Sequence, residues 1–169
     1  GAENIYFIDL EFLDDAGRAA SIAEGILARD LRIRWSFTGR ADNLDLPLAR
    51  LLARSGCRVA HYGIESGDEE ELRQMRKPGS LEKMVKGVEA GKAAGIKSVC
   101  FFLVGGSHQK LYKLLRFATR LAPDYPSFHP LIPFPGSRIA HDSGLTGEDL
   151  LEGNLIDDDE LRLRTRRAR

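Results

Sequence analysis

Short apolar runs alternate along this chain with longer amphipathic stretches, and this alternation constrains the fold more than any other feature. Short apolar runs are typical of buried strands, whereas the stretches between them carry apolar residues at helical spacing. The expected strands are Ile5–Asp9, Arg34–Thr38, Arg58–Ile64, Ser98–Val104 and Ser127–Ile132. The expected helices are residues 14–30, 47–55, 69–75, 80–94 and 109–121, with a final one from 157 to the C-terminus.

A helix between two strands returns the chain to the same end of the sheet, so the strands should run parallel. No switch in strand order is visible, and this favours an α/β fold of the partial (β/α) TIM-like barrel type. Residues 1–145 would form the barrel, and residues 146–169 a C-terminal helical extension. A flavodoxin-like open sheet is the structural alternative, because periodicity alone does not separate the two.

The composition excludes several classes of protein. The chain has 25 basic and 25 acidic residues and a formal net charge of zero, so nothing global favours nucleic acid or an anionic membrane. No apolar run approaches the roughly 20 residues that span a bilayer. Free thiols fit a reducing compartment, and we therefore expect a cytoplasmic protein. The two cysteines, Cys57 and Cys100, cannot build a four-cysteine zinc site or a three-cysteine cluster loop. Each lies in an apolar run, where a buried free thiol is expected.

Polar residues follow the strands at their carboxyl ends, which is where parallel α/β folds bind ligands. Alternation in the third strand places Val59, His61, Gly63 and Glu65 on one face and Ala60, Tyr62 and Ile64 on the other. The first, more polar set should point into the barrel. A carboxylate there needs a partner or a ligand, because burying a lone charge is costly.

At these residues the sequence resembles radical S-adenosylmethionine enzymes, in particular the subgroup that often carries a cobalamin-binding domain. The most specific pieces, taken together, are Tyr62-Gly63-Ile64-Glu65-Ser66-Gly67 and Pro133-Phe134-Pro135-Gly136. Further matching pieces are Ile5–Phe12, Trp35 with Arg40-Ala41-Asp42, Gly56-Cys57, Lys77 and Ala94-Gly95-Ile96. They cover nearly the whole chain in order.

The resemblance implies that the chain holds strands two to six of a six-stranded barrel. It implies S-adenosylmethionine and a [4Fe–4S] cluster as cofactors of the parent enzyme, with cobalamin as a further possibility and a small-molecule substrate of unknown identity. Methyl transfer, cyclisation or another radical rearrangement would be the reaction.

The resemblance also assigns cofactor-binding roles to individual residues. Asp9 and Glu11 would lie near the methionine part of S-adenosylmethionine or near the substrate. Glu65, with Ser66 beside it, would reach the ribose or methionine part, and Arg40 could pair with a carboxylate. The backbone at Gly105 and Pro133 would contact the adenosine.

Two departures from the family pattern matter. The first strand and its Cys-x3-Cys-x2-Cys loop are missing, so we expect the chain alone to be catalytically inactive and to derive from a longer protein. The usual Gly-x-Pro-Gly-Glu-Thr after the fifth strand reads Gly105-Gly106-Ser107-His108-Gln109-Lys110.

Other interpretations remain open at this point. The chain could be a non-catalytic barrel that self-associates through the exposed edge of Ile5–Asp9. It could instead be an aldolase-like barrel that binds a phosphorylated metabolite through the amides of Gly105–Ser107. Glu65 could form a structural ion pair with Arg40 or Arg58, and Asp9 and Glu11 could cap a helix or bind loop amides. The histidines lack a close ligand spacing, so we expect no metal site formed by them.

Overall fold

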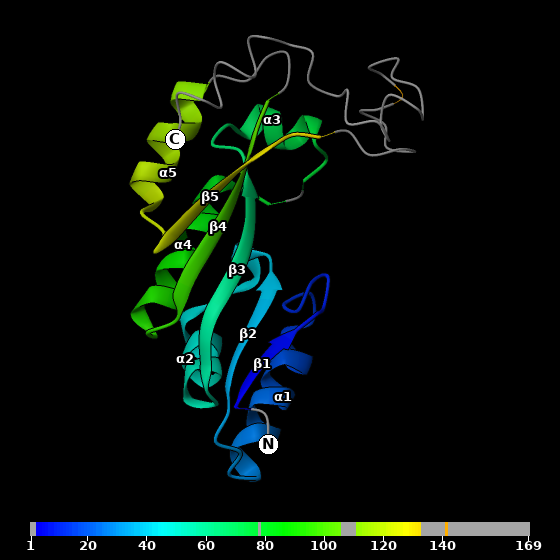
Figure 1. Cartoon of the computed structure of the whole chain (residues 1–169), viewed down its shortest axis with the longest axis vertical. Helices are drawn as coiled ribbons and strands as arrows, with labels where there is room; N and C mark the ends of the chain where they lie inside the picture. The colour runs from blue at the N-terminus through cyan, green and yellow to red at the C-terminus, as the bar shows by residue number, and fades with distance from the viewer. Residues whose placement is uncertain (1–2, 78, 106–110, 133–140, 142–169) are drawn as a thin grey trace. The chain divides into compact units, whose positions relative to one another are not determined.

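The chain is described by a computed structural model in which residues 3–77, 79–105, 111–132 and 141 are placed (Figure 1). The strands are β1 (Asn4–Phe7), β2 (Arg34–Gly39), β3 (Cys57–Glu65), β4 (Lys97–Val104) and β5 (Tyr125–Pro130). The helices are α1 (Ala16–Ala28), the 3₁₀ helix η1 (Ala41–Asn43), α2 (Leu46–Arg54), α3 (Glu69–Gln74), α4 (Leu81–Ala93) and α5 (Leu111–Leu121).

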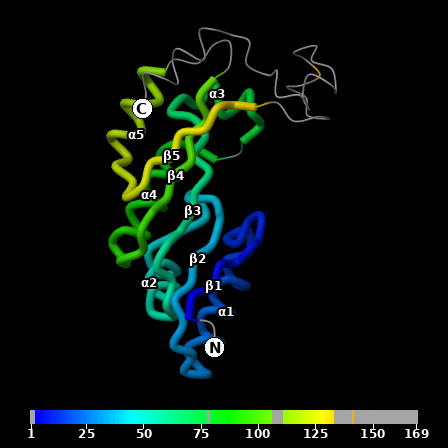
Figure 2. Tube along the Cα trace, viewed as in Figure 1, coloured from blue at the N-terminus to red at the C-terminus, as the bar shows by residue number. Residues whose placement is uncertain are grey.

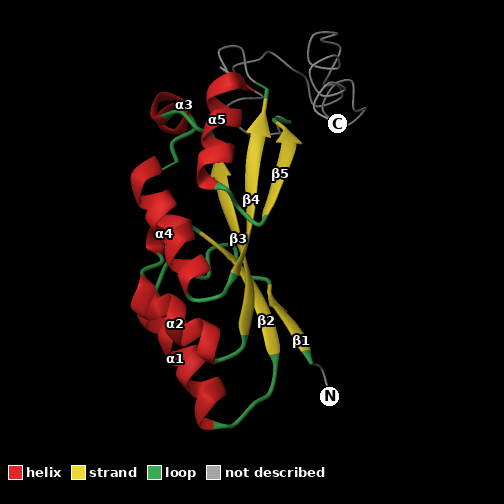
Figure 3. Ribbon diagram, turned by 90° about the vertical axis from the view of Figure 1, so that its left-hand side faces the viewer, coloured by secondary structure: helices red, strands yellow, loops and turns green. Residues whose placement is uncertain are grey.

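The strands lie in one sheet in sequence order, β1-β2-β3-β4-β5, and the chain can be followed from strand to strand in Figure 2. The pairs β1–β2, β2–β3 and β3–β4 are parallel. Helices α1, α2, α4 and α5 lie on one side of the sheet in Figure 3. A flavodoxin-like sheet would reverse its strand order and carry helices on both faces. The partial (β/α) barrel architecture is therefore confirmed.

The core lies between the helices and the face of the sheet that they cover. Side chains of β2 and β3 on this face are at most 2 % exposed, for example Phe37 at 0 % and Tyr62 at 1 %, and Phe102 of β4 is 0 % exposed. The helices contribute the equally buried Ala19, Leu52 and Val88 to the same layer. The alternation expected for β3 is confirmed, because Ala60, Tyr62 and Ile64 are buried and His61, Gly63 and Glu65 are only partly so.

The first strand is shorter than expected. The structure ends β1 at Phe7, whereas the sequence suggested Asp9. After Phe7 the chain crosses the carboxyl end of β2, where the amide of Phe12 donates to the carbonyl of Thr38 at 3.0 Å. The ring of Phe12 packs between Phe7 and Phe37, at centroid distances of 5.1 and 5.0 Å. The Phe12 ring is 0 % exposed, and its burial stabilises a turn after Phe7. Ile8 and Asp9 therefore belong to this turn and not to β1.

The last described strand also differs, since β5 begins at Tyr125 and not at Ser127. The carboxylate of Asp124 accepts from the amide of Ser98 at 2.9 Å and from its hydroxyl at 3.1 Å. Lys97 binds the other carboxylate oxygen at 2.7 Å. These bonds hold the chain before Tyr125 at the start of β4, so pairing begins earlier.

The chain divides into two units, Gly1–Phe102 with Lys110–Phe128, and Leu103–Gln109 with His129–Arg169. The first unit holds the helices named above and most of the sheet. In the second, the amide of Leu131 donates to the carbonyl of Val104 at 2.8 Å. The expected helix after 157 lies outside the described residues. Among the residues that the structure places, no helix is long and apolar enough to cross a bilayer.

Candidate functional site

Glu65 ends β3 in an unusual backbone conformation. Its φ is +69°, in the left-handed region that side chains rarely adopt, and the pairing with β4 shifts register between Gly63 and Glu65. A bulge of this kind re-aims a side chain, and such local strain clusters at functional sites. The carboxylate meets the ammonium of Lys77 at 3.1 Å, and both side chains are about one-fifth exposed, at 22 % and 19 %.

Glu11 and Arg40 come together at the carboxyl end of β2. The Glu11 carboxylate accepts a hydrogen bond from the amide of Arg40 at 2.6 Å. The guanidinium of Arg40 binds both oxygens of Asp42, at 3.0 and 2.5 Å. Two parallel bonds of this type fix the orientation of the arginine. We call Glu11, Arg40, Asp42, Glu65 and Lys77 the acid–base cluster.

The charges in this cluster act on one another. Burial raises the pKa of the Glu11 carboxyl, and the Arg40 amide, the Arg40 charge and the Lys77 charge partly offset this effect. The Lys77 charge thus reaches Glu11, in addition to the ion pair that Lys77 forms with Glu65. Asp42 raises the pKa of the Arg40 guanidinium by its hydrogen bonds, and this arginine stays charged.

Two glycines let the chain approach this cluster closely. A Cβ at Gly79, whose φ is +103°, would lie 2.1 Å from an Asp42 carboxylate oxygen. A Cβ at Gly87 in α4 would lie 1.7 Å from the carbonyl oxygen of Ala41. Helix α4 therefore packs directly on η1 and supports the segment from Arg40 to Asp42.

Some of the expected cofactor-binding residues do not join the cluster. Asp9 turns to the first helix and pairs with Arg18 at 2.6 Å. The side chain of Ser66 is buried, where it binds the Glu71 carboxylate and accepts from the amide of Asp68 at 3.0 Å. Gly105 belongs to the second unit, and its φ is +123°. Pro133 lies outside the described residues, as do Gly106 and Ser107 of the expected phosphate loop.

The ion-pair partner of Glu65 was not anticipated. We expected Arg40 or Arg58 as a structural partner, but Arg40 is held by Asp42, and Arg58 donates to the carbonyls of Ala53 and Cys57. Lys77 takes their place. Lys77 lies in a connection without periodicity, so only its match to the family motif marked it as a residue of interest.

The two thiols are buried within the first unit and are not suited to bind an iron–sulfur cluster. Both are free and 0 % exposed, and burial raises the pKa of each to about 12. Metal ions bind the thiolate form, which this environment disfavours. The expectation of buried, free thiols is confirmed.

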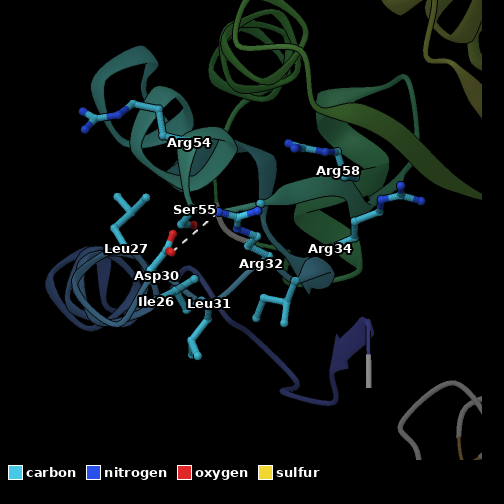
Figure 4. A pocket seen from close by; sticks show the side chains of 11 residues that line it. Ile26, Leu27, Asp30, Leu31, Arg32, Arg34, Arg54, Ser55 and Arg58 are labelled. Carbon is cyan, nitrogen blue, oxygen red and sulfur yellow. Dashed lines mark ion pairs between the residues drawn. The ribbon is translucent and has the colours of Figure 1, made fainter. Parts of the chain in front are cut away.

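A basic hollow lies at the opposite ends of the strands, where β2 and β3 begin. It has a volume of about 430 Å³ and is lined by Arg32, Arg34, Arg54 and Arg58 among others (Figure 4). The guanidinium groups of Arg34 and Arg54 point away from each other, and Arg32 pairs with Asp30 at 3.9 Å. These arginines do not converge on one ligand, so the acid–base cluster is the better candidate site.

Comparison with known families decides which class of protein this is. The family model described as "Radical SAM superfamily" matches residues 1–119. The chain belongs to this superfamily. Its members use S-adenosylmethionine with a [4Fe–4S] cluster, and the resemblance seen in the sequence is confirmed.

Similar proteins narrow the comparison. An uncharacterized methyltransferase of Pyrococcus horikoshii is 26 % identical over 142 residues, which are 82 % of this chain and 31 % of that protein. The radical S-adenosylmethionine methyltransferase TsrM from Kitasatospora setae, solved with cobalamin and a [4Fe–4S] cluster, matches with a TM-score of 0.69 and 19 % identity over 76 % of this chain and 27 % of TsrM.

The cobalamin-dependent radical enzyme OxsB, solved with aqua-cobalamin and S-adenosylmethionine, matches with a TM-score of 0.62 and 23 % identity. That match covers 95 % of this chain and 23 % of OxsB. At these identities the structural likeness establishes the fold. The chain spans less than a third of each of these relatives.

Proposed function

We propose that this chain carries the S-adenosylmethionine-binding core of a cobalamin-dependent radical methyltransferase. The observation that carries the proposal is the Glu65–Lys77 pair at the strained end of β3, with Glu11 within electrostatic reach of the same lysine. These charges stand at the carboxyl ends of parallel strands, where ligands of such folds bind.

The cluster fits the amino-acid end of S-adenosylmethionine. That end carries one ammonium and one carboxylate, and the cluster offers both charge signs on partly buried groups. Lys77 would hold the carboxylate, while Glu65 and Glu11 would hold the ammonium. A charge-assisted bond to a partly buried group is stronger than one at an exposed surface, because water screens it less.

Arg40 would position Glu11 through its backbone amide, and Asp42 would hold Arg40 in place. Its guanidinium is already bound at two points by Asp42, so its amide donor to Glu11 is held at a fixed position. One carboxylate oxygen of Glu11 is thus held in place by the Arg40 amide. The pKa of Glu11 is raised by burial, and a bound ammonium beside it would stabilise the ionised form.

The residues present do not fit the iron–sulfur cluster. The chain has two cysteines, and both are buried thiols with a pKa of about 12. Three thiolates for a [4Fe–4S] cluster must therefore come from residues other than these 169. We expect the chain alone to bind S-adenosylmethionine without cleaving it.

Titration of S-adenosylmethionine into the chain by calorimetry tests the binding site. Lys77→Met and Glu65→Gln should each weaken binding at least about tenfold, or roughly 1.4 kcal/mol. Lys86→Met is the matched control, because Lys86 also pairs with a glutamate, Glu82 at 2.7 Å, on the exposed surface of α4. Equal affinity for Lys77→Met and the unchanged chain would reject the assignment.

The methyltransferase part of the proposal needs a protein that includes the cluster ligands. Anaerobic reconstitution of such a longer protein should yield a [4Fe–4S] cluster and bound cobalamin, seen by their absorption spectra. Glu65→Gln in that protein should lower methyl transfer and leave the cluster spectrum unchanged. A protein that gives 5′-deoxyadenosine without ever binding cobalamin would place it in another branch of the superfamily.

Self-association is a second candidate property. Among the described strands β1 is the outermost in the sheet order, and Ile8 and Leu10 just beyond it are 93 % and 98 % exposed. A strand edge of this kind, with apolar side chains beside it, favours pairing with another strand. We expect a dimer or higher oligomer by light scattering at high concentration, and a monomer would contradict this.

A further inference from the structure

Three rings stand on the face of the sheet opposite the helices in the first unit. They are Tyr6 of β1, His61 of β3 and Phe101 of β4, and alternation places them opposite the face that the helices cover. Their neighbours Tyr62, Cys100 and Phe102 point to the helices and are at most 1 % exposed. We call Tyr6, His61 and Phe101 the aromatic row.

The rings of the aromatic row contact one another across the strands. Tyr6 and His61 are 5.4 Å apart with planes tilted by 60°, and they reach over β2, which lies between their strands. His61 and Phe101 are 6.0 Å apart with planes only 23° from parallel. The hydroxyl of Tyr6 is hydrogen-bonded to that of Thr38 at 2.5 Å. The row is thus a connected surface whose first ring is fixed by a polar contact.

This surface is partly exposed, and its three side chains carry no formal charge at neutral pH. Tyr6 is 49 % exposed, and His61 and Phe101 are half-buried. Burial lowers the pKa of the His61 imidazole, which therefore stays neutral at pH 7. An uncharged, ring-lined surface favours ligands with an apolar face.

The aromatic row adjoins the acid–base cluster. Gly63 follows His61 by two residues on the same face of β3, and a Cβ there would lie 2.4 Å from a Glu65 carboxylate oxygen and 3.1 Å from the Lys77 nitrogen. The ion pair therefore covers the position next to the His61 ring. A charged region for the cofactor and an aromatic region for a second ligand are neighbours on one strand.

We propose that the aromatic row is the substrate subsite and that it takes an uncharged planar aromatic ring. This inference rests on the proposed function, which assigns the adjoining cluster to S-adenosylmethionine. Ring pairs are attractive in offset and edge-to-face arrangements by about 0.5–1.5 kcal/mol beyond burial of area, and a saturated ring of the same size gains none of this. The row therefore selects aromatic over aliphatic substrates.

Phenol and cyclohexanol form a matched pair of probes, because they have the same size, no charge and one hydroxyl. Titration of each into the full chain, followed by NMR of the His61 and Phe101 ring signals, should show phenol binding about three to ten times more tightly. His61→Phe should keep this preference, since it keeps a ring. His61→Leu should abolish it, and Phe101→Leu should reduce it.

S-adenosylmethionine titrations of the same variants separate this inference from the proposed function. His61→Leu should bind S-adenosylmethionine as the unchanged chain does, which also shows that the variant is folded. Equal affinities for phenol and cyclohexanol would overturn the subsite. If Lys77→Met alone then lost S-adenosylmethionine binding, the proposed function would still be supported. Displacement of phenol by saturating S-adenosylmethionine would assign the row to the cofactor and also overturn the subsite.

Discussion

Gly87→Ala offers a sharp test of how α4 supports the site. The added methyl would lie 1.7 Å from the carbonyl oxygen of Ala41, and relief to at least 3.0 Å requires α4 and η1 to separate. Backbone carbonyls cannot rotate away as flexible side chains do, so the cost of overpacking should be near the upper end of the usual range, about 3 kcal/mol. Alanine regains about 1 kcal/mol of helix propensity over glycine. The free energy of unfolding should therefore fall by about 2 kcal/mol.

Gly25→Ala in α1 is the matched control. There the added Cβ would meet only the end of the flexible Arg29 side chain, at 3.2 Å. The propensity gain should dominate, and the variant should be more stable by about 0.5–1 kcal/mol. Urea denaturation of both variants, followed by circular dichroism, measures the two values. A Gly87→Ala chain as stable as the unchanged one would refute the close packing of α4 on η1.

Two further predictions concern ionisable groups. The Lys97 ammonium and the Ser98 amide hold the pKa of Asp124 at about 2, below its usual 3.8, so this carboxylate stabilises the fold above pH 4 and loses that effect as the pH falls toward 2. Asp124→Asn should cost roughly 1–2 kcal/mol at pH 7, after allowance for the exposure of Lys97. In urea denaturation curves the difference should shrink to a small fraction of this near pH 2. Burial raises the pKa of Cys57 and Cys100 to about 12, so little thiolate is present at pH 8. Both should react with iodoacetamide roughly a thousandfold more slowly in the folded chain than in urea. Comparable rates would contradict their burial.

Much of the fold could be predicted from the sequence, because apolar periodicity reports directly on burial. The alternation in β3 placed His61 and Glu65 on the face away from the helices and Tyr62 on the helix face, as the structure has them. The end of β1 was misplaced, because the packing of Phe12 on Phe7 and Phe37 depends on contacts between distant residues that periodicity does not encode.

The candidate site was predicted only in part. Strand ends gave Glu11, Arg40 and Glu65, because parallel strands bring their carboxyl ends to one edge. Side-chain partners were beyond the sequence. Asp9 turns to Arg18, and Lys77 reaches back to Glu65 from a connection twelve positions later. Each choice depends on the path of a loop, which local sequence does not determine.

Gly63 leaves room for the Glu65 carboxylate beside β3. A methyl group there would occupy the volume of the Glu65 carboxylate, 2.4 Å away, without touching the hydrophobic layer behind the sheet. Gly63→Ala would thus displace a negative charge and leave the scaffold intact. A single small substitution at this residue would therefore change the charge at the end of β3 at little risk to folding.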